Sequence, residues 1–112
     1  MRDIKLYLKD ILSSSNAIIA FIEGMEYEEF CKDDKTVSAV IKKLEIIGEA
    51  AKKIPHEITS ANSGIPWKEM AGMRDILIHS YFGTEFEAVW LAAKTSVPEL
   101  IPKIEKLLKE II

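Results

Sequence analysis

The sequence lacks any hydrophobic run long enough to cross a lipid bilayer. Its longest uninterrupted apolar run extends from Ala17 to Ile22, whereas a membrane-spanning helix needs about 20 apolar residues. The first five residues include three charged side chains, so they do not match the apolar centre of a secretory signal peptide. We therefore expect a cytoplasmic protein that does not bind membranes.

Cysteine is almost absent, because Cys31 is the single one in the chain. It cannot form an internal disulfide, and no second cysteine or nearby histidine offers the ligand spacing of a metal site. We interpret Cys31 as a core or boundary residue. A Gly-rich phosphate-binding loop is also missing, which disfavours a nucleotide-binding accessory domain. The sequence thus predicts no metal and no other cofactor.

A basic excess is missing as well. The chain has 15 basic and 18 acidic residues, and its net charge is −3. Proteins that hold nucleic acid through many phosphates carry a broad basic surface, so any contact with RNA must be local. The 48% of hydrophobic and 29% of charged residues are typical of a packed globule. A chain of 112 residues can bury one core, and we expect one domain, residues 1–112.

Two long stretches carry apolar residues at helical spacing. The first runs from Asp3 to Phe21 and ends near Gly24, a residue that commonly terminates helices. The second runs from Lys35 to Ile54 and stops before Pro55. The acidic pair at positions 33 and 34 offers an N-cap for this second helix.

The second half of the chain predicts further helices. A third helix should extend from Trp67 to about Phe82, and Thr84 with Glu87 three positions later matches the capping pattern that starts a fourth. Residues 56–65 have almost no periodicity, so we predict a loop with at most one short turn. Residues 27–32 could form a single helical turn.

Two prolines leave the C-terminal stretch open to two interpretations. Pro98 and Pro102 interrupt an apolar pattern that runs from Phe86 to Ile111. Either the helix kinks there, or Ser96 caps a fifth helix. Since no alternating strand pattern appears, we predict an all-α bundle of four to five helices.

The predicted third helix is apolar on two sides. At about 100° per residue, one arc that should face the core contains Met70, Met73, Ile76 and Leu77. Ile78 and Phe82 lie beside the opposite side. A second apolar side needs burial, and a partner subunit is its simplest provider. We therefore expect a symmetric homodimer in which this helix faces its copy.

Four residues of the same helix could carry chemistry. Arg74 and Tyr81 are nearly in line, whereas Arg74 and His79 of one chain are about 140° apart, so a productive pair could come from two subunits. Histidine transfers protons near neutral pH, and RNA supplies its own 2′-hydroxyl nucleophile, which makes a metal unnecessary. Arg74 would stabilise the charge on the phosphate, and Asp75 would orient the imidazole.

A plainer interpretation of these residues is a solvated helix face. An Arg-x4-His spacing recurs by accident, and Tyr81 could be an interfacial aromatic residue with its hydroxyl in water. Glu45 and Glu49 are four apart but have no third ligand at helical spacing, so we interpret them as structural or interface residues.

Two longer blocks carry a family resemblance. The stretch from Ile65 to Phe82 reads IPWKEMAGMRDILIHSYF, and the stretch from Leu44 to Ala51 reads LEIIGEAA. Together, at this separation and chain length, they resemble the HepT-like proteins of the HEPN superfamily. The resemblance implies a dimerising helical bundle, a metal-independent ribonuclease toxin, and an antitoxin partner of the minimal nucleotidyltransferase (MNT) type.

The resemblance also assigns residues. It implies that Arg74 and His79 form the ribonuclease pair with Asp75 in support, and that Tyr81 is the tyrosine to which the antitoxin attaches AMP, a bulky anion that would repel RNA. A second function stays open: a non-catalytic subunit whose groove docks the nucleotidyltransferase. The acidic net charge and Asp75, where many relatives have Asn, favour this second function, whereas the intact Arg, His and Tyr set favours the ribonuclease.

Overall fold

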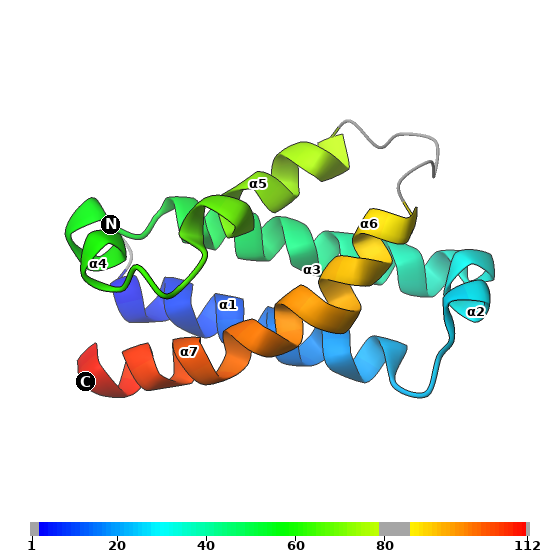
Figure 1. The fold of residues 1–112 in the computed structure, drawn as a ribbon, viewed down its shortest axis with the longest axis horizontal. Coiled ribbons are helices and arrows are strands. Elements are labelled where there is room, and N and C mark those ends of the chain that lie inside the picture. The colour runs from blue at the N-terminus through cyan, green and yellow to red at the C-terminus, as the bar shows by residue number, and fades with distance from the viewer. Residues whose placement is uncertain (1–2, 79–85, 112) are drawn as a thin grey trace.

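The chain folds into a bundle of helices (Figure 1). The computed structural model describes residues 3–78 and 86–111, and within them every side chain except those of residues 74–78. No strand occurs in these residues, so the all-α prediction is confirmed. None of the helices formed by them combines the length and apolarity of a membrane span.

Within the described residues, four long helices lie along the four principal helices expected from the sequence, and the last of them covers only the later part of the helix expected to begin at Thr84. They are α1 (Ile4–Ile22), α3 (Asp34–Lys52), α5 (Trp67–Ile78) and α7 (Val97–Ile111). Helix α1 packs between α3 and α7, and α5 lies against α3 (Figure 1). The bounds of α1 and α3 differ from the predicted ones by at most two residues.

Three short helices connect the long ones: α2 (Tyr27–Lys32), α4 (His56–Ala61) and α6 (Phe86–Leu91). Helix α4 is longer than the short turn expected in this stretch. Side-chain bonds to the backbone within α4 support it, since the Thr59 hydroxyl donates to the His56 carbonyl at 3.2 Å. Helix α4 has little signature in the sequence, because none of its residues is buried and it therefore carries no apolar stripe.

The predicted end of α1 and the predicted start of α3 are confirmed by their local geometry. The Asp33 carboxylate accepts from the Thr36 backbone N–H at 3.0 Å and so caps α3. Gly24 follows the end of α1 with a φ of 77°, the left-handed conformation that glycine adopts without strain. Both devices turn the chain sharply into and out of α2.

The C-terminal stretch kinks rather than breaks. A π-helical segment, η1 (Ala92–Ser96), joins α6 to α7, and the Val97 N–H donates to the Ala92 carbonyl. The alternative in which Ser96 caps a separate helix is therefore wrong. Pro98 has no N–H to donate and its ring would crowd the carbonyl four residues earlier. The wider π turn just before it relieves this crowding, and the helical rod bends there (Figure 1).

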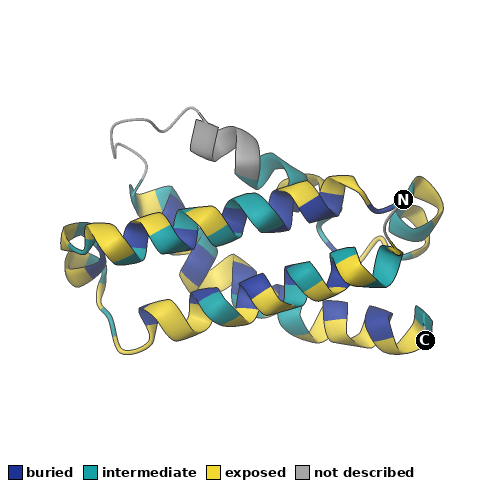
Figure 2. Cartoon of the chain, turned by 180° about the vertical axis from the view of Figure 1, so that it is seen from behind, coloured by how far each residue is buried: buried dark blue, intermediate teal, exposed yellow. Residues whose placement is uncertain are grey.

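The core lies between α1, α3, α5 and α7. Buried positions recur along each helix between exposed ones, as Figure 2 shows from behind. Ser15, a polar residue within the apolar stripe of α1, is also buried, and its hydroxyl donates to the Ile11 carbonyl at 2.7 Å. Cys31 is half-buried, as expected for a boundary residue. The largest fully buried side chains are Phe30, Leu8, Ile11, Ile18, Leu44, Ile47, Met70, Leu100 and Ile104.

Candidate functional site

Helix α5, which carries the start of the candidate motif, is fixed firmly at its first turn. The Trp67 indole Nε1 donates to the Asn62 carbonyl at 3.1 Å, and the Asn62 amide Nδ2 donates to the Ile58 carbonyl at 2.8 Å. The Met70 N–H donates to the Pro66 carbonyl at 3.0 Å and closes the first helical turn. Thus the residues just before α5 tie its N-terminus to α4.

The core-facing arc predicted for α5 is confirmed as far as its side chains are described. Met70 is 0% exposed and Met73 is half-buried. Both pack against the bundle, and α5 lies against α3 along much of its length. Gly48 is buried within α3.

The four candidate residues lie at the end of α5 and beyond it. Arg74 and Asp75 belong to α5, eight and nine positions into the helix, but their side chains lie outside the described ones. His79 and Tyr81 lie outside the described residues altogether. The arrangement of the four side chains around one phosphate, and the second apolar side with Phe82, therefore stay predictions.

The chain re-enters the described structure at α6, which an aromatic cluster fixes to α2. The Trp90 ring lies 5.0 Å from the Phe30 ring and 6.1 Å from the Tyr27 ring, measured between centroids. The Lys94 ammonium lies 5.6 Å from the Trp90 centroid, within cation–π range. Phe30 is fully buried. The segment of residues 79–85, which includes His79, is therefore bounded by two helices with fixed positions.

Tyr27 in this cluster is held in its neutral form. A hydrogen bond with the Cys31 thiol, followed by partial desolvation and the nearby Glu87 and Glu28 carboxylates, raises the pKa of the Tyr27 phenol. The phenol therefore stays uncharged beside Trp90.

The carboxylate pair of α3 lines a small cavity that is better suited to ion pairing than to a metal. Glu45 and Glu49 share a space of about 190 Å³ between α1 and α3 with Lys42 and Lys53. The Lys42 Nζ lies 3.9 Å from the Glu45 carboxylate. Among the described residues, no group of three or more His, Cys, Asp or Glu side chains could hold a metal ion. Glu45 and Glu49 fit the structural interpretation.

The negative charge of the chain is concentrated at one end of the bundle. Residues 23–34, which follow the last residue of α1 and include all of α2 and the first residue of α3, hold six acidic residues and one basic residue. This stretch contributes −5 to the net charge of −3, so the rest of the chain carries +2. Figure 1 places α2 at one extreme of the molecule. The acidic total is therefore compatible with a neutral or basic surface elsewhere.

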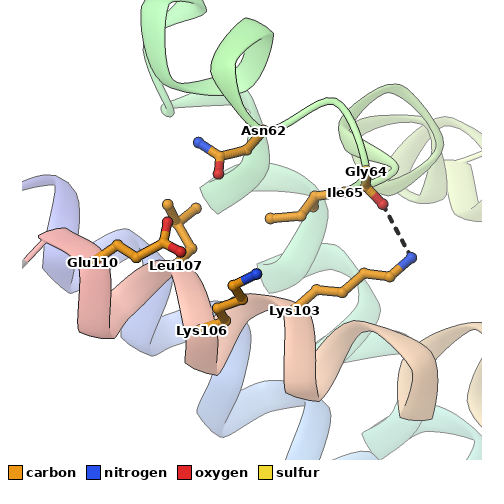
Figure 3. Close-up of a pocket in the computed structure, with 7 residues that line it drawn as sticks. All are labelled: Asn62, Gly64, Ile65, Lys103, Lys106, Leu107 and Glu110. Atoms are coloured by element: carbon orange, nitrogen blue, oxygen red, sulfur yellow. Dashed lines mark hydrogen bonds between the residues drawn. The ribbon is translucent and has the colours of Figure 1, made fainter.

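Sequence reasoning missed a cavity between α7 and the loop after α4. It has a volume of about 200 Å³ and contains polar groups of three kinds: an amide, ammonium groups and a carboxylate (Figure 3). A possible sequence signal was the spacing of Lys103, Lys106 and Glu110 on one side of α7, but such charges are usually solvated. Only the folded loop shows that they border a hollow.

Comparison with known proteins places the chain among ribonuclease HepT-like sequences. The family model described as "Ribonuclease HepT-like" matches residues 11–107. A putative RNase of Methanocaldococcus jannaschii is 50% identical over 110 residues, which cover 98% of this chain and 91% of that protein. A probable ribonuclease HepT of Thermococcus cleftensis is 46% identical over 108 residues, which cover 96% of this chain and 98% of that protein.

No solved structure gave a significant match. The family model nevertheless extends from the middle of α1 into the last helix, and the relatives match along nearly their whole length. The chain therefore belongs to the ribonuclease HepT-like family.

Proposed function

We propose that this protein is a metal-independent endoribonuclease that cuts RNA through Arg74 and His79. The observation that carries the proposal is membership of the ribonuclease HepT-like family across residues 11–107, a range that contains both residues. The relatives named as RNases match over the same range. The Arg-x4-His spacing is too common to indicate a ribonuclease by itself, but within a family of ribonucleases it supports this assignment.

The proposed reaction needs only groups that the protein and RNA possess. An imidazole of His79 takes the proton from a ribose 2′-hydroxyl, and the 2′-oxygen forms a bond to the adjacent phosphorus. The bond from phosphorus to the 5′-oxygen of the next nucleotide breaks, and that oxygen receives a proton from a second His79 imidazole or from water. The products are a 2′,3′-cyclic phosphate and a 5′-hydroxyl end. Arg74 stabilises the added negative charge on the phosphate.

The bounded position of the motif supports such chemistry, because catalysis requires groups held in place. Helix α5 is fixed at Trp67 and Met70 before the motif, and α6 is fixed at Trp90 after it. Only seven residues, 79–85, connect the described parts of the two helices. His79 follows Ile78, the last residue of α5, directly in the sequence.

We propose further that the complete site forms in a homodimer. Arg74 and His79 of one chain differ by about 140° around a helix, so two copies of α5 that face one another would bring an arginine of one subunit to a histidine of the other. Ile78 and Phe82 would supply the apolar contact between the copies.

The proposed biological setting is a toxin–antitoxin pair. An MNT-type nucleotidyltransferase would transfer AMP from ATP to the Tyr81 hydroxyl, with release of pyrophosphate. The new phosphate beside the groove would repel RNA and block the site. We expect the protein to act in the cytoplasm, where RNA and such a partner are available.

The test compares purified wild type with His79→Ala and Arg74→Ala on a panel of cellular RNAs in the presence of a chelator. The chain has two histidines, so His56→Ala, in the exposed helix α4, is the matched control for His79→Ala. Lys68→Ala, an exposed cation at the start of α5, is the control for Arg74→Ala.

Wild type and both controls should cut RNA, and the two motif variants should be inert while melting as cooperatively as wild type. If the motif variants cut as fast as wild type, the assignment is wrong. If folded wild type is inert but binds an MNT-type nucleotidyltransferase, the non-catalytic docking function replaces the ribonuclease. Asp75 and the acidic net charge of −3 are the observations that favour this second function.

A further inference from the structure

The cavity between α7 and the loop after α4 has a preformed frame. The Lys103 Nζ reaches across from α7 and donates to the Gly64 carbonyl at 3.0 Å, which closes one rim (Figure 3). On the opposite rim, two hydrogen bonds hold Asn62. Its side-chain Nδ2 donates to the Ile58 backbone carbonyl, and its own backbone carbonyl accepts from the Trp67 indole Nε1. The Lys103–Gly64 bond joins parts of the chain 39 positions apart in sequence, whereas the two bonds of Asn62 are local.

Three polar groups of the cavity are left to face a ligand. In Figure 3 the Lys106 ammonium, the Glu110 carboxylate and the Asn62 amide oxygen border the same space. The Asn62 nitrogen is already used, so its oxygen remains an acceptor. Ile65, which is buried, and Leu107 supply apolar walls beside them.

This combination excludes simple ligands. A phosphate would meet the Glu110 carboxylate, which repels it, and a purely apolar group would gain nothing from Lys106 and Glu110, which are exposed on α7. The volume of about 200 Å³ is below the roughly 300–1,000 Å³ of pockets for drug-sized ligands. A single flat ring with donors and acceptors along its edge matches both the size and the polarity.

We propose that this cavity binds a guanine base. Guanine presents the N1–H and the N2 amino group side by side, and the two oxygens of the Glu110 carboxylate can accept from both. Its O6 and N7 are acceptors, which suit the Lys106 ammonium. Adenine offers a single amino donor on that edge, and uracil a single N–H between two carbonyls. Ile65 and Leu107 would contact the faces of the ring.

The guanine can belong to single-stranded RNA or to a free nucleotide. Ile65, which lines the cavity, lies two residues before Trp67 at the start of α5, and Arg74 lies seven residues after Trp67, about 10 Å along the helix. One RNA strand can therefore reach both places, and single-stranded RNA exposes the base edges that such a cavity would read. The proposal that the bound guanine belongs to RNA depends on the proposed ribonuclease function, whereas the proposal of a guanine site does not.

The first arm of the test titrates the purified full chain with 5′-GMP and with 5′-AMP and follows binding by calorimetry. The variants are Glu110→Gln and Lys106→Met. Glu105→Gln and Lys109→Met are matched controls, because both residues are exposed on α7 and neither lines the cavity. GMP should bind saturably and at least 10-fold more tightly than AMP, and each cavity variant should weaken it about 10-fold or more. Controls should bind as wild type does.

The site is refuted if GMP does not saturate, if AMP binds equally well, or if the controls lose as much affinity as the cavity variants. Arg74→Ala should keep GMP binding even though the proposed function predicts that it loses cleavage. A failure of cleavage and a failure of the guanine site therefore give different results.

The second arm separates the two sources of guanine. Oligonucleotides with one guanine at successive distances from the cut are compared with the same sequences carrying adenine there. If the cavity reads RNA, one distance should show faster cleavage with guanine, Glu110→Gln should abolish that difference, and Glu105→Gln should keep it. If GMP binds but no position matters, the guanine site stands with a free nucleotide as its ligand.

Discussion

The indole nitrogen of Trp67 donates a hydrogen bond to the backbone carbonyl of Asn62, across 3.1 Å. This bond joins the first residue of α5 to the end of α4, and the same Asn62 borders the cavity beside α7. The helix that carries Arg74 and the proposed guanine site therefore share one fixed point.

Replacing Trp67 with Phe tests this fixed point. The ring still fills most of the space, but the Asn62 carbonyl loses its donor, so we expect the variant to be about 1 kcal/mol less stable. Urea denaturation followed by circular dichroism gives the value, with Lys68→Ala as the neighbouring exposed control. Equal stability of Trp67→Phe and wild type would mean that water replaces the indole without cost.

The aromatic cluster between α2 and α6 should be a main source of stability. Phe30 is fully buried against Trp90, and Phe30→Ala should cost about 3–5 kcal/mol because it leaves a cavity. Tyr27→Phe keeps the ring and removes only the hydroxyl, whose hydrogen bond is to a thiol, a weak partner, so its Tm should stay close to that of wild type. A small loss for Phe30→Ala would show that α2 is not needed to hold α6.

The Asp33 cap predicts a pH dependence with a definite sign. Hydrogen bonds from the backbone N–H and the hydroxyl of Thr36 lower the pKa of the Asp33 carboxyl below its ordinary value of 3.8. A lowered pKa in the folded state means that the cap stabilises fully above pH 3.8 and loses its effect as the pH falls through the folded value.

Asp33→Ala should therefore lower Tm by about 2–6 °C at pH 7, and the difference from wild type should shrink as the pH falls below 3.8. Asp34→Ala is the matched control, because Asp34 is exposed and is not the capping residue. A difference that stays constant down to pH 2 would exclude the charged cap as the cause.

The long helices could be predicted from the sequence because each buries one face. Apolar residues at spacings of three and four located α1 and α3, and Asp33 and Gly24 located two of their ends. Short α4 was underestimated, since it buries no side chain and depends on local bonds such as that of Thr59. The choice between a kink and a break at Pro98 required the π segment to be seen.

The candidate sites could likewise be predicted from the sequence only in part. The position of Arg74 on a helix followed from the sequence pattern and is confirmed for its backbone, but contacts between subunits depend on a second copy that periodicity alone cannot orient. The cavity at Lys106 could not be predicted, because Asn62 and Glu110 are 48 positions apart in the sequence and meet only after α4 and α7 have packed. Charged residues on an exposed helix face do not indicate that the helix borders a cavity.

The most direct test of the account is cleavage of a defined RNA in which the nucleotide at the cut carries a 2′-hydrogen in place of its 2′-hydroxyl. The proposed reaction predicts that cleavage with chelator stops at this position for wild type, and that the unmodified RNA yields a 2′,3′-cyclic phosphate whose formation requires both Arg74 and His79. Cleavage that continues through the 2′-deoxy position, or cyclic phosphate formed equally well by His79→Ala, would contradict it.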